Sequence, residues 1–216
     1  MKLVVISDTH QFHDQLVLPE GDVLVHCGDA CNEGTEEEFV SFTRWFVRQP
    51  YHVKLYVPGN HDFFPYSYPR KARSLLAGAN LLIDESITVG ELVFYGCPWM
   101  PEYMLWSFML PRGSEELEAK YATIPHMTNV LITHGPPYGI LDGWTPLMEN
   151  RGRYEPIGDA ALRLNVERVR PKLHLFGHAH AGYGQMQLED MPTRFVNASI
   201  CTEDYHPNNP PTVVEL

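Results

Sequence analysis

Short runs of apolar residues, separated by glycine, proline and charged residues, recur along the whole chain. Two of these runs, at residues 2–7 and 22–26, are rich in β-branched side chains and lack the 3.6-residue period of an amphipathic helix. Such runs predict buried strands. The same pattern predicts further strands at residues 53–57, 81–83, 87–89, 92–95, 129–133, 172–176, 183–188, 193–196 and 212–215.

Helical periodicity is clearest at residues 35–48. Thr35 and Glu38 have the spacing of a capping box, in which the threonine caps the helix and the glutamate reaches back to it. The acidic residues that follow Thr35 suit the positive end of a helix dipole. The apolar side chains expected on one face of this helix are Phe39, Phe42, Phe46 and Val47.

Three more helices are predicted, at residues 69–76, 114–121 and 159–169. The expected apolar side of the last one holds Ala160, Leu164 and Val169. Strands and helices alternate in the first part of the chain and the tail is rich in strands, which indicates layered α/β packing around a mixed sheet or two sheets. Because the chain has 216 residues and no linker, we expect one domain, residues 1–216.

Composition narrows the classes of function. The chain is 44% hydrophobic and has a formal net charge of −11, so it can bury a core and is a poor candidate for coating nucleic acid or binding an anionic membrane. No apolar run reaches the roughly 20 residues of a membrane helix, and the start of the chain does not resemble a signal peptide. The four cysteines form no CxxC pair, so we expect free thiols and a cytoplasmic protein.

Metal-ligand residues directly follow five of the predicted strands. Ligands of an open α/β sheet bind outside the carboxyl ends of its strands, so residues that follow different strands are expected to meet in one crevice. Oxygen and imidazole donors in this mixture suit divalent manganese, iron, zinc or cobalt. The five clusters are Asp8-Thr9-His10, Gly28-Asp29, Gly59-Asn60-His61-Asp62, His134-Gly135-Pro136-Pro137 and Gly177-His178-Ala179-His180.

In this order, the five clusters resemble the motifs of the calcineurin-like metallophosphoesterase superfamily. Further stretches, at residues 98–99, 110–113, 134–139, 181–184 and 197–199, are similar to its metallophosphoesterase-domain-containing (MPPED-type) subgroup. The resemblance implies an α/β/β/α sandwich with two mixed β-sheets flanked by helices. It also implies two bound divalent metal ions, with manganese as the first expectation and iron, zinc, nickel or cobalt as alternatives.

The resemblance also implies a role for each polar residue of the clusters. Asp29 would bridge the two metal ions, His61 would act as general acid toward the leaving group, and Asp62 would orient the ring of His61. The implied ligands of the first ion are Asp8, His10 and His180, and those of the second are Asn60, His134 and His178. Two such ions can clamp a phosphoryl group and generate a metal-bridging hydroxide near neutral pH.

These features predict a phosphohydrolase, and more specifically a phosphodiesterase that acts on a cyclic nucleotide or another small phosphodiester. The alternatives are a phosphomonoesterase or protein phosphatase, and a catalytically weak binding scaffold on the same fold. The complete ligand set, with His61 in place, favours the enzyme. A nuclease of this superfamily would need a basic groove, which the net charge of −11 disfavours, so no extended nucleic acid and no membrane are expected as partners.

Residues 99–111 hold a dense group of aromatic side chains: Trp99, Tyr103, Trp106 and Phe108. The segment is either a core-filling insertion or a lip that stacks on a nucleobase, and the two interpretations have equal weight. Two alternatives also stay open for Arg112, a phosphate contact or a surface salt bridge. Asn197 is either a brace for a metal ligand or a turn residue.

The other histidines and two of the cysteines are given structural interpretations. His13 and His206 have two interpretations, a position near the mouth of the site or, as the default, simple exposed polar residues. Cys27 and Cys31 flank Asp29, and we interpret them as small buried residues rather than thiolate ligands. The histidines expected to be structural are His26, His52, His126 and His174.

Overall fold

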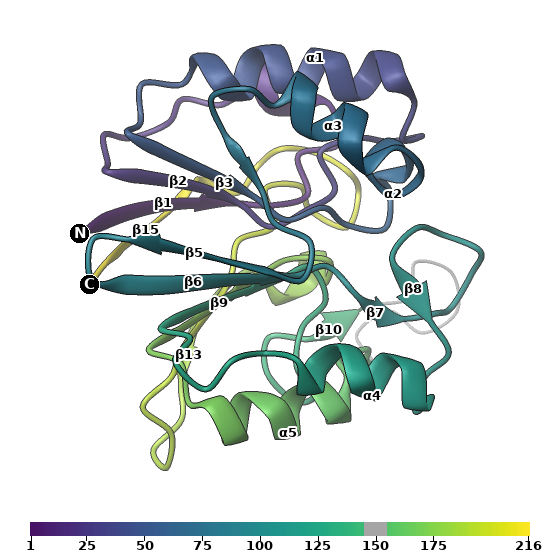
Figure 1. Cartoon of the computed structure of the whole chain (residues 1–216), viewed down its shortest axis with the longest axis vertical. Helices are drawn as coiled ribbons and strands as arrows, with labels where there is room; N and C mark the ends of the chain where they lie inside the picture. Colours follow the sequence, from purple (N-terminus) through teal and green to yellow (C-terminus); the bar gives the residue numbers. More distant parts are fainter. Residues whose placement is uncertain (145–154) are drawn as a thin grey trace.

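The computed structural model describes residues 1–144 and 155–216 of the chain. Its centre is a pair of β-sheets that face each other (Figure 1). The first sheet has the order β15-β1-β2-β3-β4, and all its neighbours are parallel except β15, which runs antiparallel to β1. Its strands are β1 (Lys2–Ile6), β2 (Val23–His26), β3 (Val53–Tyr56), β4 (Asn80–Leu81) and β15 (Thr212–Glu215).

The second sheet has the order β13-β14-β12-β9-β6-β5. Its four inner strands are parallel, and an antiparallel strand closes each edge. The strands are β5 (Glu85–Val89), β6 (Leu92–Cys97), β9 (Val130–Thr133), β12 (Leu173–Phe176), β13 (Gly184–Gln187) and β14 (Arg194–Asn197). Both sheets are therefore mixed, as the sequence predicts.

Helices cover the outer face of each sheet (Figure 1). The first sheet carries α1 (Glu36–Arg48), α2 (Phe63–Ser67) and α3 (Pro69–Leu75). The second carries α4 (Glu115–Ala122) and α5 (Ala160–Val169). The smaller elements are the 3₁₀ turns η1 (Phe12–Gln15) and η2 (His180–Gly182) and the short strands β7 (Met100–Pro101), β8 (Met109–Leu110), β10 (Gly143–Trp144) and β11 (Glu155–Pro156).

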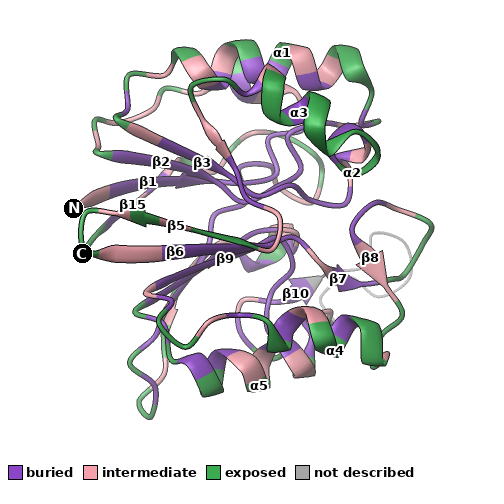
Figure 2. Cartoon of the chain, in the orientation of Figure 1, coloured by how far each residue is buried: buried purple, intermediate pink, exposed green. Residues whose placement is uncertain are grey.

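Apolar side chains fill three layers, one between the two sheets and one between each sheet and its helices. Residues of β1 and β2 are almost fully buried because these strands are covered on both faces, which explains why they read as continuous apolar runs (Figure 2). The predicted α/β/β/α sandwich is confirmed. No helix in the described part of the chain is long and apolar enough to cross a membrane.

The helix starts show where local sequence rules hold. Thr35 caps α1 as predicted, with its hydroxyl accepting a hydrogen bond from the Glu38 amide at 3.2 Å. The Glu38 carboxylate does not reach back to Thr35. It accepts the backbone amides of Asn32, Glu33 and Gly34 instead, at 2.9–3.1 Å, and so orders the loop before the helix.

The predicted apolar side of α5 is wrong. The buried side chains are Leu162, Val166 and Val169, whereas Leu164 is 65% exposed. Leu162, Val166 and Val169 follow the i, i+4, i+7 spacing of one helix face, whereas the predicted set does not, and only its member Val169 is among the buried side chains.

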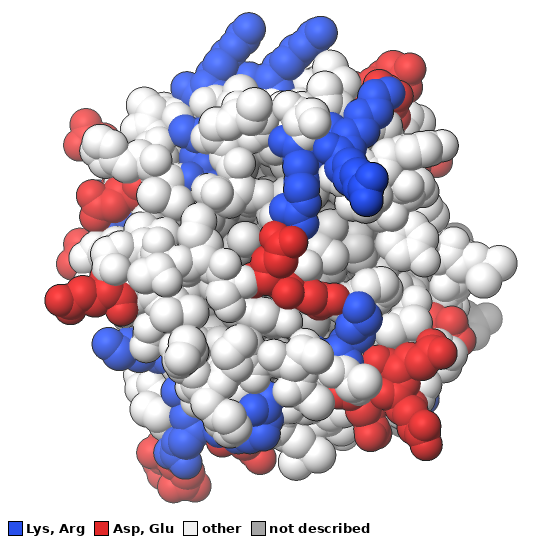
Figure 3. Space-filling view, viewed as in Figure 1, with Lys and Arg blue, Asp and Glu red and all other residues white. Residues whose placement is uncertain are grey.

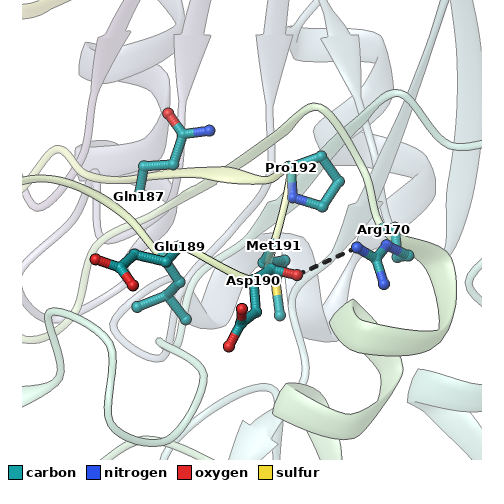
Figure 4. A pocket seen from close by; sticks show the side chains of 7 residues that line it. Arg170, Gln187, Glu189, Asp190, Met191 and Pro192 are labelled. Atoms are coloured by element: carbon teal, nitrogen blue, oxygen red, sulfur yellow. Dashed lines mark hydrogen bonds between the residues drawn. The ribbon is translucent and has the colours of Figure 1, made fainter.

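Charged side chains of both signs are interspersed with uncharged areas on the face seen in Figure 3. A shallow pocket lies at the turn between β13 and β14, where Figure 4 shows the Arg170 guanidinium donating to the backbone oxygen of Asp190 at 3.2 Å. Glu189 and Asp190 are the acidic residues of this pocket, and it contains no histidine. The clustered histidines of the chain lie elsewhere, at the carboxyl ends of the strands.

Candidate dinuclear metal centre

The loops after β1, β2, β3, β9 and β12 place the predicted ligands at one end of the two facing sheets. Four of these residues have positive φ angles: Asp8, His10, Asp29 and His178, at 40–65°. Non-glycine residues rarely adopt this conformation, and strained backbone of this kind clusters at functional sites. At these positions the chain turns sharply after each strand, and the side chains reach the groups of donors described below.

Close backbone approach explains two of the glycines in the motifs. A Cβ atom on Gly59 would lie 2.3 Å from an Asp29 carboxylate oxygen, and one on Gly177 would lie 2.1 Å from an Asp8 carboxylate oxygen. Only glycine therefore lets the strand ends pack against these carboxylates.

The first group of converging donors is Asp8, His10 and His180, whose ligand atoms lie within 4.8 Å of one another. His180 Nδ1 donates to the backbone oxygen of Thr202 at 3.0 Å, so its Nε2 is turned toward Asp8 Oδ1 at 3.4 Å. Burial alone would raise the pKa of Asp8, but the hydrogen bond and charge of His180 outweigh it and hold that pKa well below its ordinary value.

The second group is Asp29, His134 and His178, within the same 4.8 Å limit. His134 Nδ1 donates to the backbone oxygen of Cys27 at 2.9 Å, and its Nε2 faces two oxygens. These are Asp29 Oδ2 at 3.2 Å and Asn60 Oδ1 at 3.0 Å. Burial alone would lower the pKa of His134, but the charge and hydrogen bond of Asp29 outweigh it and raise that pKa to about 9, so without metal the Nε2 hydrogen serves these oxygens. A bound metal ion would take the place of that proton.

Asp29 lies between the two groups. It also forms a third group with His10 and His61, so its carboxylate is near donors of both proposed ions. One of its oxygens, Oδ1, accepts the backbone amide of His61 at 2.8 Å. Burial alone would raise the pKa of Asp29, and the surrounding histidines, His134 first, lower it well below its ordinary value. This position suits a bridging carboxylate.

The donors fit a pair of divalent cations on the evidence of the side chains themselves. His10 is 1% exposed, and neither of its ring nitrogens has a hydrogen-bond partner within the described residues. An unpaired buried polar atom costs about 1–3 kcal/mol, which a bound cation would offset. Burial lowers the pKa of His10 to about 4 and that of His178 to about 3, so both rings are neutral and able to ligate metal at neutral pH.

His61 stands beside these groups, with its side chain 12% exposed. Its Nδ1 donates to the backbone oxygen of Asn32 at 2.6 Å, and its Nε2 lies 4.0 Å from Asp29 Oδ2. The expectation that Asp62 orients this ring is therefore wrong. The backbone carbonyl of Asn32 orients the ring instead. Because every residue has a backbone carbonyl, the sequence cannot reveal this contact.

Asp62 has a different place. It is fully buried, and its carboxylate accepts the backbone amides of Asp29 at 2.8 Å, Cys31 at 3.1 Å and Gly59 at 2.7 Å. Burial and the nearby Asp29 raise the pKa of Asp62 to about 6. The side chain ties the loop after β2 to the loop after β3, and thereby fixes Asp29 relative to Asn60.

Contacts from the C-terminal strands support Asp8. Ser199 Oγ donates to Asp8 Oδ2 at 2.9 Å and Asn197 Oδ1 at 2.8 Å. The amide nitrogen of Asn197 donates to the backbone oxygens of Leu141 and Ala179. Of the two interpretations of Asn197, the brace is the one the structure favours. It acts through Ser199, which lies in the noted stretch 197–199 but for which the sequence predicts no role.

Several other predicted positions lie outside the site. His13 is fully buried and packs against Phe42 and Trp45, so the expectation that it is exposed is wrong. Arg112 donates to the backbone oxygens of Ile157 and Gly158 and lies 3.6 Å from Asp159, which favours the salt-bridge interpretation.

The four cysteines are free and buried, as expected. Burial raises the pKa of Cys27 and of Cys31 well above the ordinary value, so both are neutral thiols at neutral pH. Neither belongs to a group of converging donors among the described residues. They pack in the layers beside the first sheet, in agreement with the structural interpretation.

In the aromatic segment at residues 99–111, two side chains fill the core and two lie at the site. Trp99 and Phe108 pack against each other and against Tyr66, and Phe108 is 2% exposed, which is a core role. Trp106 lies against His61, with ring centroids 4.1 Å apart. The Tyr103 hydroxyl accepts a hydrogen bond from the Asn60 amide nitrogen at 3.4 Å. These two side chains face the site.

Comparison with known proteins agrees with the geometry. The model of the calcineurin-like phosphoesterase family matches residues 1–182. Metallophosphoesterase domain-containing protein 1 of Homo sapiens and that of Mus musculus are each 40% identical over 240 aligned residues, which cover 100% of this chain and 71% of the relative. The crystal structure of phosphopantetheinyl hydrolase from Mycobacterium tuberculosis shares the fold, with a TM-score of 0.60 at 16% identity over 94% of this chain and 90% of that one. This chain is a member of the calcineurin-like phosphoesterase family.

Proposed function

We propose that this protein is a dinuclear metal-dependent phosphohydrolase that prefers small phosphodiesters. Membership of the family supports a metal-dependent phosphoesterase. The observation that carries the proposal is the convergence of carboxylate and imidazole donors from five strand ends on one small volume, with Asp29 between two groups of them.

In this proposal, Asp29 reaches both ions and the other ligands divide into two sets. The first set is Asp8, His10 and His180, and the second is Asn60, His134 and His178. Manganese is the first expectation, and iron, zinc, nickel and cobalt also suit this mixture of nitrogen and oxygen donors. When bound, two such ions supply Lewis-acid activation of the phosphoryl group and of a water molecule.

His61 supplies the proton for the leaving group. In the protonated ring, Nδ1 donates to the Asn32 carbonyl and Nε2 carries the proton that passes to the leaving oxygen. After the transfer the neutral ring keeps its Nδ1 hydrogen on the same carbonyl. The ring therefore does not have to turn during the reaction, and the fixed contact with Asn32 replaces the carboxylate that was expected to orient it.

Asp62 acts as a positioning residue rather than a catalytic one. Its carboxylate accepts backbone amides from the loops that carry Asp29 and Asn60, so it sets the spacing between a bridging ligand and a ligand of the second ion. Residues of this kind in metal sites typically change metal affinity by about 10–100-fold when they are altered.

The test is a panel assay on protein stripped by a chelator and then loaded with Mn²⁺, Fe²⁺, Zn²⁺, Ni²⁺, Co²⁺ or Mg²⁺. The substrates are bis-p-nitrophenyl phosphate, p-nitrophenyl phosphate and cyclic nucleotides. We expect no turnover without metal and a higher kcat/KM for diesters than for the monoester. A higher value for p-nitrophenyl phosphate would instead identify a phosphomonoesterase. Two bound ions per chain without turnover of any substrate would identify a binding scaffold.

A further inference from the structure

Three aromatic side chains surround the mouth of the proposed metal centre, and we call Tyr103, Trp106 and Tyr205 the aromatic rim. Each contacts a different part of the histidine cluster. The ring centroids of Trp106 and His61 lie 4.1 Å apart, and those of Tyr103 and His178 lie 5.8 Å apart. Tyr205, which comes from a distant part of the chain, lies 4.8 Å from His10.

Four rings contact one another in succession at the site. The centroids of His61 and His10 lie 4.8 Å apart in an edge-to-face arrangement, so the succession of contacts is Trp106, His61, His10 and Tyr205. Tyr205 also contacts His180 at 5.2 Å. Trp106 and Tyr205 therefore contact different rings of the site, the proposed general acid His61 and the proposed metal ligand His10.

Both ends of the rim are held in place by backbone contacts. On one side, Ser107 Oγ donates to the backbone oxygens of Gly59 and Asn60 at 3.1 and 2.8 Å, which fixes the segment carrying Tyr103 and Trp106 to the loop after β3. On the other side, Tyr205 has a φ of 56° and lies in a turn closed by a hydrogen bond from its amide to the oxygen of Thr202. Non-glycine residues rarely adopt this conformation, and backbone of this kind clusters at functional sites.

The rim is not explained by packing alone. Tyr103 is 57% exposed and Tyr205 is 47% exposed, whereas the core aromatic of the same segment, Phe108, is 2% exposed. Large aromatic side chains that stay exposed around a polar site, fixed by backbone hydrogen bonds, offer flat surfaces to a ligand. Every aryl ring or nucleobase has a flat face that can stack on them.

We propose that the aromatic rim binds the organic substituents of the phosphodiester, with Trp106 on the leaving-group side and Tyr205 on the side of the second substituent. This inference rests on the proposed function. The acid His61 has to lie beside the leaving oxygen, and the ring of Trp106 packs against that of His61 at a tilt of 53°. In this proposal, a phosphoryl group bound beside His61 and His10 presents its leaving group to Trp106 and its other substituent to Tyr205, which contacts His10.

The inference defines a substrate class: small phosphodiesters in which the group that is retained is flat and unsaturated, such as an aryl ring or a nucleoside. Tyr103 adds a polar contact. Its hydroxyl accepts from the Asn60 amide nitrogen, so its own hydrogen is free to donate to a phosphoryl oxygen.

Two substrates with the same leaving group isolate the role of Tyr205. Bis-p-nitrophenyl phosphate and methyl p-nitrophenyl phosphate both release p-nitrophenolate, but the first retains an aryl group and the second a methyl group. We expect manganese-loaded wild-type protein to prefer the aryl diester in kcat/KM. In Tyr205→Ala this preference should shrink by about 5- to 100-fold, the effect of losing one stacking partner. Tyr205→Phe keeps the ring and should keep the preference.

A binding measurement separates recognition from turnover. Calorimetry would compare the dissociation constants of phenylphosphonate and methylphosphonate, which are inert, for the metal-loaded protein. The preference for the phenyl compound should be present in wild type and reduced in Trp106→Leu or Tyr205→Ala. The matched control is Tyr68→Ala, which removes an exposed tyrosine that packs on Phe64 outside the rim and should leave both preferences unchanged.

The outcomes distinguish the two proposals. An unchanged aryl preference in Tyr205→Ala, in protein that still hydrolyses both diesters and keeps its metal content, overturns the rim inference and leaves the phosphohydrolase intact. An equal loss on both substrates gives Tyr205 a structural role and also overturns the inference. The absence of metal-dependent hydrolysis in wild type would overturn the proposed function, whatever the rim variants do.

Discussion

The metal centre and the aromatic rim are neighbours, yet they are built in different ways. The centre consists of nearly buried donors that directly follow parallel strands, and their backbone is fixed by the sheets. The rim consists of more exposed rings on irregular segments, held by a few hydrogen bonds such as those of Ser107. The sheets fix the positions of the donors, and in our proposal the irregular segments around them select the substrate.

The largest effect should follow removal of the bridging carboxylate. Asp29→Asn is expected to lower metal-dependent turnover by at least about 10³-fold, because one side chain serves both proposed ions. Metal content, measured after dialysis, should fall at both sites. The exposed Asp14→Asn is the matched control and should keep both properties. Loss of turnover with full metal content would contradict a bridging role.

The second effect concerns the proposed acid. His61→Ala should lower turnover by about 10²–10⁴-fold on diesters with alkoxide leaving groups, and less on p-nitrophenyl esters, because p-nitrophenolate needs little protonation. Metal content should match that of wild type, and His52→Ala, at an exposed position, is the control. If both leaving groups lose activity equally, His61 positions the phosphate rather than donating a proton.

A smaller effect is expected at Asp62, which belongs to the support of the centre. Asp62→Asn replaces one acceptor oxygen by a donor, so at least one backbone amide of the two loops loses its partner. The apparent metal affinity should weaken by about 10–100-fold, with kcat largely restored at saturating metal. Lower kcat at saturating metal, with unchanged affinity, would return Asp62 to the role of orienting His61.

The smallest effect tests the scaffold. Burial lowers the pKa of His174 to about 3, from an ordinary value of 6.5. Between these two values the unfolded chain binds a proton at this histidine and the folded chain does not. The contribution of neutral His174 to the free energy of unfolding is therefore complete above pH 6.5 and is lost as the pH falls toward 3. At pH 5.5 the loss is about 1.4 kcal/mol. The unfolding free energy would be measured by urea unfolding between pH 7 and 5.5. In His174→Asn its decrease over this range should be smaller than in wild type by about 1.4 kcal/mol, and an equal decrease would contradict the prediction.

The same contrast explains how much the sequence could reveal. The ligand clusters were predictable because each follows a buried strand, and the ends of parallel strands meet. The role of the Asn32 carbonyl was not predictable, since a backbone acceptor has no sequence pattern. Ser199 lies in the noted stretch 197–199, but the resemblance there does not reveal its contact with Asp8. Tyr205 was missed because its turn brings it to the site only through tertiary contacts.

The errors have physical reasons as well. The predicted apolar side of α5 is wrong because Ala160, Leu164 and Val169 do not share one helix face, whereas the buried Leu162, Val166 and Val169 follow the i, i+4, i+7 spacing. His13 was expected at the surface because it lies in a polar segment, yet the turn η1 folds it under Trp45.

The central claim, a dinuclear centre held by residues of five loops, is tested most directly by metal stoichiometry. Protein stripped with a chelator, reloaded with manganese and freed of excess metal would be analysed for metal ions per chain by mass spectrometry. The account predicts two ions in wild type and a loss at both sites in Asp29→Asn. A ratio of one or less in active wild-type protein would contradict it.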